Sequence, residues 1–202
     1  MTHKDNQHIT IPVFPLGYLV LPGEKKELHI FEERYKELVS DCLRNNASFG
    51  VVLPDKKNKK VSSNGVVVKI IKVLKTSPSG ELDILVEGVS VFKTIQYVPV
   101  LFPKLYGAAT IEFVFGDDKI CTRELQNFYK SFLISIEDKN PDFENATIFQ
   151  LAKKLNLTNE EKMRLLSYAD TETKELMLKD KIRLLLYVYE AEKKLKGDFW
   201  LN

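Results

Sequence analysis

His29 and Glu32 lie three positions apart and are a pair of side chains that could exchange a proton near neutral pH. His29 falls at the end of an apolar, strand-like segment, whereas Glu32 begins a helix-like one, so the two side chains need not converge. Glu32 and Glu33 are typical of a first helical turn, where carboxylates complement the helix dipole. We therefore interpret His29 as a packing residue and predict no catalytic residue.

Metal and nucleotide chemistry find no support in the remaining residues. The three histidines are scattered, and the two cysteines, Cys42 and Cys121, show no zinc-ligand spacing. None of the nine glycines opens a Gly-x-x-x-x-Gly-Lys-Ser/Thr loop. We predict no cofactor and no metal. Cys42 shares a helical face with Tyr35 and Leu38, which indicates a buried thiol.

A lysine-rich loop is the clearest basic feature of the chain. Lys56, Lys57, Lys59 and Lys60 follow one another almost directly, and lysines at 69, 72 and 75 could extend a basic patch. Such a patch could contact RNA phosphates. Aromatic residues that would stack on bases do not interleave the lysines, which favours a solvated loop. Nucleic-acid binding stays the alternative hypothesis.

The segment from Tyr97 to Pro103 is apolar and is interrupted by two prolines, which cannot donate to a sheet ladder. We predict that Tyr97, Leu101 and Phe102 contribute to an exposed apolar patch that binds polypeptide. Tyr18 and Leu19, in another proline-bounded loop, could extend this patch. In the alternative interpretation both loops pack against the helical half of the chain.

Periodicity divides the chain into two halves. Period-two and β-branched segments through residue 115, for example Leu82–Glu87 and Gly65–Lys75, predict about six strands. One helix, 32–45, interrupts them and presents Phe31, Tyr35, Leu38 and Cys42 on one face. Closure would protect the strand edges, so we predict a small barrel in residues 1–116.

After residue 116 the pattern becomes helical, and we predict a bundle, 117–202, packed on the barrel. A helix over 125–136 must end before Asn140-Pro141, and others are expected over 148–155 and from the capping box at Thr158. A last helix from 170 to about 195 carries two apolar stripes, which predicts a central position in the bundle. Gly197 should end that helix.

The residues from Ile11 to Glu32, with prolines at 12, 15 and 22, resemble the start of the amino-terminal, substrate-binding domain of Lon proteases. In this pattern Gly23 should turn the chain so that residues 28–31 return alongside the first strand. The resemblance continues through Arg34-Tyr35, 49–52 and the segment Leu85-Val86-Glu87-Gly88 with Phe92. It is strongest to small bacterial proteins that carry this domain alone. Val91 and the segment 63–66 depart from the family pattern.

The resemblance implies an α+β fold, a PUA-like β pseudobarrel with one inserted helix, followed by a helical bundle. It also implies a non-catalytic module that recognises unfolded polypeptide or a protease or chaperone partner. Composition agrees with a soluble globular protein: 44% of residues are hydrophobic, 29% are charged and the net charge is +2. The polar first residues and the absence of a long apolar run lead us to expect a cytoplasmic protein with no membrane partner.

Overall fold

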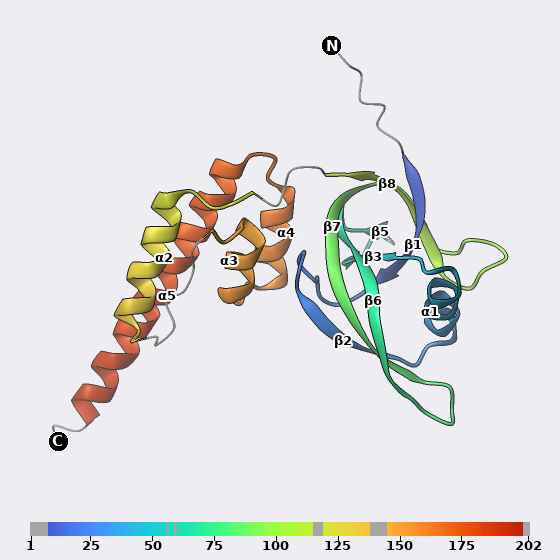
Figure 1. Cartoon of the computed structure of the whole chain (residues 1–202), viewed down its shortest axis with the longest axis horizontal. Helices are drawn as coiled ribbons and strands as arrows, with labels where there is room; N and C mark the ends of the chain where they lie inside the picture. Colours follow the sequence, from blue (N-terminus) through green and yellow to red (C-terminus); the bar gives the residue numbers. More distant parts are fainter. Residues whose placement is uncertain (1–7, 56, 59, 115–118, 138–144, 200–202) are drawn as a thin grey trace, which may run out of the picture. The chain divides into compact units, whose positions relative to one another are not determined.

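The structure, a computed structural model, describes residues 8–55, 57–58, 60–114, 119–137 and 145–199. Its chain divides into two compact units (Figure 1). The barrel unit comprises residues 1–115 together with 159–167, and the helical unit comprises 116–158 and 168–202. A short helix from the carboxy-terminal half of the sequence, α4 (Asn159–Ser167), thus belongs to the barrel unit.

The barrel unit is built on one six-stranded sheet. Its strands are β1 (Ile9–Pro15), β2 (Lys25–Ile30), β3 (Phe49–Val52), β6 (Asn64–Thr76), β7 (Leu82–Val98) and β8 (Gly107–Phe113). Their order is β2-β7-β6-β3-β1-β8, and β7 also pairs with β8. That additional pairing closes β7, β6, β3, β1 and β8 into a ring, which confirms the predicted barrel.

Strand β7 makes the closure possible because it is long enough to have different partners along its length. Residues 82–87 pair with β2, whereas residues 92–98 pair with β8. Its pairing with β6 contains three register shifts, which bend the ladder as β-bulges do. Inside the ring, the side chains of Val13, Phe92 and Ile111 belong to one buried cluster.

Strand β2 does not lie where the sequence suggested. Gly23 has a positive φ of 70° and turns the chain as predicted. However, residues 25–30 pair antiparallel with β7 and not with β1, which pairs with β3 and β8. The segment between β1 and β2 crosses β7 at Gly88, where Gly23 N donates to the Gly88 carbonyl over 2.8 Å.

Helix α1 (Glu33–Asn45) lies between β2 and β3 in the chain, as predicted, and buries Tyr35, Leu38, Val39 and Cys42. The ring of Tyr35 stacks on that of Phe14 in β1, with centroids 3.8 Å apart, and so fixes the helix on the barrel. Phe31, which was expected on the same face, precedes the helix and is exposed. Its backbone belongs to the connection from β2, where the helical periodicity does not yet apply.

The helical unit contains α2 (Arg123–Ser135), α3 (Ile148–Lys154) and α5 (Thr171–Phe199). Leu178 and Ile182 of α5 are fully buried, but Leu184 and Val188 are exposed, so the second apolar stripe is not covered as predicted. Helix α5 also continues through Gly197, because one glycine costs a long helix only about 1 kcal/mol. In the described part of the chain no helix is long and apolar enough to cross a bilayer.

Candidate functional site

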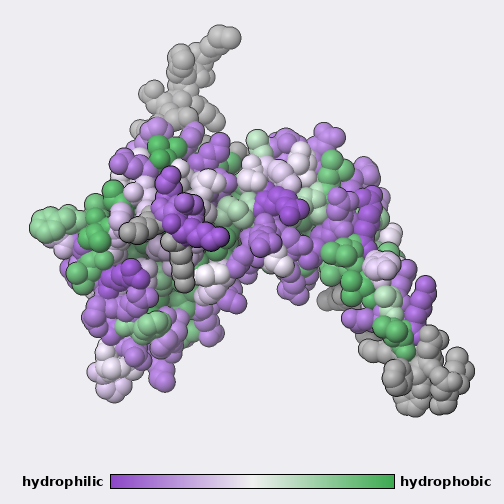
Figure 2. Space-filling model, turned by 180° about the vertical axis from the view of Figure 1, so that it is seen from behind, coloured by the Kyte–Doolittle hydropathy of each residue, from purple (hydrophilic) through white to green (hydrophobic). Residues whose placement is uncertain are grey.

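The loop from Pro99 to Tyr106, between β7 and β8, presents the most exposed large apolar side chain of the described residues. Phe102 is 92% exposed, and Val100, Leu101 and Leu105 are 58%, 36% and 56% exposed. We call these four side chains the apolar tip. Figure 1 shows the loop beside α1, and Figure 2 shows apolar side chains gathered at the corresponding end of the molecule, on the left. Such a patch is typical of an interaction surface.

The backbone of this loop is folded on itself. The amide of Leu101 donates to the Tyr106 carbonyl over 2.8 Å, and that of Lys104 donates to the Leu101 carbonyl over 2.7 Å. The peptide bond between Phe102 and Pro103 is cis. At the base of the loop, a Cβ on Gly107 would lie 2.8 Å from the Val98 carbonyl oxygen, so the two ends of the loop approach too closely for a side chain there.

Side chains of α1 hold the loop from one side. Asp41 Oδ2 accepts hydrogen bonds from Lys104 Nζ at 2.6 Å and from the Tyr106 hydroxyl at 2.8 Å. Glu37 Oε2 accepts a bond from the Leu105 amide at 2.9 Å, and Lys104 Nζ lies 3.5 Å from Glu37 Oε1. We call Glu37, Asp41, Lys104 and Tyr106 the α1 clamp. Glu37 and Asp41 are four positions apart, so they share one helical face.

The charges of the clamp stabilise one another. The hydrogen bonds from Lys104 and Tyr106 lower the pKa of the Asp41 carboxyl group. The same contact with Asp41 raises the pKa of Lys104. Burial, and then the hydrogen bond to Asp41, raise the pKa of the Tyr106 hydroxyl. Asp41 is therefore a carboxylate, Lys104 an ammonium and Tyr106 a neutral donor throughout the neutral pH range.

Of the predicted polypeptide-binding residues, Leu101 and Phe102 lie together in the apolar tip. Tyr97 is near the end of β7, half-buried against the barrel core, and burial raises its pKa. Tyr18 is half-buried, and its hydroxyl donates to the Glu27 carbonyl over 3.5 Å.

Leu19 is 1% exposed, so the expectation that it extends an exposed patch is corrected. The physical reason is α4, which covers the segment between β1 and β2. Asn159 Oδ1 accepts a bond from the Leu19 amide, and Lys162 Nζ donates to the Leu19 carbonyl over 2.9 Å. Lys162 also contacts both carboxylate oxygens of Glu24, at 2.8 and 3.0 Å.

The structure adds no support for nucleic-acid binding by the lysine-rich loop. Lys57 and Lys60 are exposed, and Lys56 and Lys59 lie outside the described residues. Lys60 begins the two-residue strand β5 (Lys60–Val61), which pairs with β4 (Pro54–Asp55). Lys69, which was considered part of the same patch, is paired with Glu87 at 3.0 Å.

His29 and Glu32 do not contact each other as a pair. His29 is exposed and therefore not a core packing residue; its ring stacks on that of Phe31, with centroids 5.8 Å apart, and its Nδ1 lies 2.7 Å from Asp83 Oδ1, the residue opposite it on β7. Glu32 instead pairs with Arg34 at 2.6 Å. Burial raises the pKa of the Cys42 thiol to about 11, as expected for an unreactive core cysteine. Among the described residues no three His, Cys, Asp or Glu side chains gather as metal ligands do.

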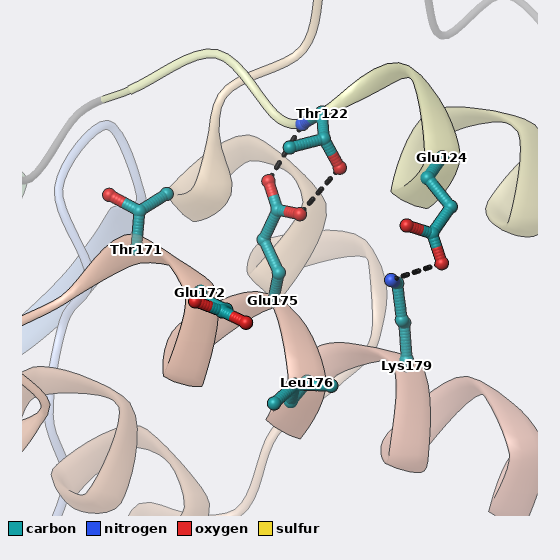
Figure 3. A pocket seen from close by; sticks show the side chains of 7 residues that line it. All are labelled: Thr122, Glu124, Thr171, Glu172, Glu175, Leu176 and Lys179. Atoms are coloured by element: carbon teal, nitrogen blue, oxygen red, sulfur yellow. Dashed lines mark hydrogen bonds and ion pairs between the residues drawn. The ribbon is translucent and has the colours of Figure 1, made fainter.

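The helical unit contains a pocket of about 570 Å³, shown in Figure 3. Glu175 is its most buried polar residue and accepts bonds from the amide and hydroxyl of Thr122, the N-cap residue of α2. Lys179 pairs with Glu124 at 2.7 Å. These polar groups stabilise the start of α2. The polar side chains of Glu175 and Lys179 in the pocket are thus engaged with residues at the start of α2.

Sequence reasoning named neither Val100 nor Leu105 as a site residue and missed the whole α1 clamp. Val100 lies within the apolar segment that was singled out, and Leu105 follows two positions after its end, so both could have been found. The clamp carries no local signal: Asp41 and Lys104 are 63 positions apart and occur in unremarkable polar contexts.

The comparisons with known proteins agree with this fold. The family model described as "ATP-dependent protease La (LON) substrate-binding domain" matches residues 10–185. A Lon N-terminal domain protein from Xanthomonas campestris is 24% identical, with a TM-score of 0.63 over 89% of this chain and 98% of that one. The N-terminal domain of the Mycobacterium avium complex Lon protease is 17% identical, with a TM-score of 0.63 over 87% and 98%. No curated protein matches the chain.

Proposed function

The chain belongs to the family of LON substrate-binding domains, and from this membership we propose that it is a non-catalytic module that binds unfolded polypeptide through the apolar tip. The ligand class is an extended segment with apolar side chains, as an unfolded protein or a partner of a protease or chaperone would present. Membership of this family supports a substrate-binding role, and the exposure of the apolar tip supports its use as the binding surface.

One observation carries the proposal: Phe102 is almost fully exposed although its loop is hydrogen-bonded and anchored. Full burial of a phenylalanine side chain stabilises a folded protein by about 1.5–3 kcal/mol, so such a side chain is normally buried. In this loop the side chains of Lys104 and Tyr106 point to α1, while the apolar side chains of the tip point to solvent. An apolar ligand gains this burial energy when it covers the tip.

The tip suits a ligand recognised by apolarity and not by sequence. Val100, Leu101, Phe102 and Leu105 offer no charge, and the acidic groups nearest to them are occupied by the loop itself. Rigid aromatic anchors contribute strongly to binding because they lose little conformational entropy. The module is therefore expected to prefer segments rich in aliphatic and aromatic residues over charged ones.

The test compares the double variant Leu101→Ser/Phe102→Ser with a matched control, Val89→Thr/Ile95→Thr. Val89 and Ile95 are half-exposed apolar side chains of β7, so the control makes apolar surface more polar elsewhere on the barrel unit. The probe is fluorescently labelled α-lactalbumin that has been reduced and carboxymethylated so that it stays unfolded. Affinity is measured by anisotropy and stability by thermal unfolding.

We expect the serine variant to bind the probe at least tenfold more weakly with an almost unchanged melting temperature, and the control to bind like the wild type. Equal losses of affinity in both variants would show that the probe binds non-specifically to apolar surface. An unchanged affinity in the serine variant would mean that the binding site lies elsewhere. Replacing Lys57 and Lys60 with glutamine tests whether the lysine-rich loop, and not the apolar tip, is the binding surface. Loss of binding in that variant alone would contradict the proposal.

A further inference from the structure

We propose that the α1 clamp holds the apolar tip in its binding conformation, so that Glu37, Asp41, Lys104 and Tyr106 are positioning residues for polypeptide recognition. The inference rests on the proposed function of the tip. It assigns a role to four polar residues that do not themselves offer apolar contact area to a ligand.

The hydrogen bonds of the clamp all end on side chains of α1. The two backbone bonds within the loop close it on itself, and the carboxylates of Glu37 and Asp41 accept the bonds from Lys104 Nζ, the Leu105 amide and the Tyr106 hydroxyl. The barrel ladder that begins at Gly107 does not involve these carboxylates. A substitution in the clamp can therefore free the loop without breaking a strand pairing.

The anchored residues of the loop all lie on the carboxy-terminal side of Phe102. Lys104 and Leu105 follow Phe102 after Pro103, and Tyr106 ends the loop with its side chain buried. The Asp41 side chain is only 12% exposed, so its two charge-assisted bonds are partly shielded from water. Leu105 is held by its amide on Glu37, and its side chain, like that of Phe102, is exposed to solvent.

Pre-organisation of this kind raises affinity because a mobile loop must be ordered when the ligand binds. Each side chain that is immobilised on binding lowers affinity by a factor of about 2 to 12. Release of the tip from α1 should therefore weaken probe binding about 3- to 10-fold, less than removal of the apolar side chains themselves. The weakening should appear in a slower association or a faster dissociation without loss of the fold.

The experiment uses two matched pairs of variants of the full chain. Glu37→Ala removes the acceptor of the Leu105 amide, whereas Glu37→Gln keeps an oxygen that can accept it. Lys104→Met removes the ion pair with Asp41, whereas Lys104→Arg can restore it. For each variant we measure amide hydrogen exchange at Leu105 and affinity for the carboxymethylated α-lactalbumin probe. Leu101→Ser/Phe102→Ser is measured alongside.

The proposal expects faster exchange at Leu105 and 3- to 10-fold weaker binding in Glu37→Ala and Lys104→Met, with both values restored in the conservative partners. Glu37 is partly exposed, so its pair stays informative if a Lys104 variant fails to fold. Faster exchange with unchanged affinity would overturn the inference while the proposed function stands, provided that Leu101→Ser/Phe102→Ser weakens binding. If that serine variant binds normally, the proposed function itself fails.

Discussion

Gly88→Ala is expected to destabilise the barrel unit because the chain between β1 and β2 passes directly over this residue. A Cβ on Gly88 would lie 2.2 Å from the Leu21 carbonyl oxygen and 3.2 Å from Pro22 Cα. Two backbone hydrogen bonds also meet here, from Gly23 N to the Gly88 carbonyl and from Gly88 N to the Glu24 carbonyl. The crossing cannot accept a methyl group without moving.

The magnitude follows from these contacts. Each weakened backbone bond costs about 0.5–1.5 kcal/mol, and overpacking of a tight site costs about 1–3 kcal/mol. The lower entropy of the unfolded alanine chain offsets about 0.4–1 kcal/mol. We expect a net loss of roughly 2–5 kcal/mol in the free energy of unfolding, which corresponds to roughly 8–20 °C in melting temperature.

The assay is thermal unfolding followed by far-ultraviolet circular dichroism, with Gly17→Ala as the control. A Cβ on Gly17 would meet nothing within 4 Å, although Gly17 lies in the same segment. This control should change the unfolding free energy by less than about 1 kcal/mol. If the two variants melt at the same temperature, the close crossing at Gly88 is refuted.

The purified protein is expected not to hydrolyse ATP, because the sequence lacks a phosphate-binding loop; ATPase activity that co-purifies with the protein at constant specific activity through successive columns would contradict this. Lys162→Met should lower the free energy of unfolding, measured in urea, by about 1–3 kcal/mol, because it leaves the Glu24 carboxylate without its lysine partner. An unchanged free energy of unfolding would show that Lys162 does not help to anchor α4. Leu178→Ala should cost about 2–5 kcal/mol and Leu184→Ala less than about 1 kcal/mol, because only Leu178 is buried; equal costs would mean that the second stripe is covered. The pKa of Asp41 is lowered in the folded protein, so its contribution to stability is complete above the ordinary aspartate pKa and is lost as pH falls through the folded value. The stability difference between wild type and Asp41→Asn should therefore stay constant from about pH 5 to 8 and shrink below about pH 4; a difference that vanishes between pH 7 and pH 5 would contradict the assignment.

The general fold could be predicted because its signals are local. Alternation and β-branched residues mark the strands, and the apolar face of 33–45 marks the inserted helix, so the sequence predicted both the barrel and its interruption. Partner choice between strands is not local. The segment 25–30 pairs with residues 82–87, more than fifty positions away, and nothing within the segment distinguishes that partner from β1.

In the candidate site, too, local features could be predicted from the sequence and long-range contacts could not. The exposure of Leu101 and Phe102 could be inferred because two prolines interrupt an apolar segment, which excludes it from a regular strand. The burial of Leu19 was expected only in the alternative interpretation, in which its loop packs against the helical half, and its partners Asn159 and Lys162, about 140 positions later in the chain, could not be identified. The partner that anchors the tip, Asp41, is 63 positions from Lys104 in the sequence and so is likewise not indicated locally.

The most direct test of the central claim is a nuclear magnetic resonance titration of the isotopically labelled protein with the carboxymethylated α-lactalbumin probe. Binding through the apolar tip predicts saturable shifts or broadening of the amides from Val100 to Leu105, with smaller effects at Glu37 and Asp41 on α1. Perturbations centred on Lys57 and Lys60 or on α5, with the loop unaffected, would contradict it.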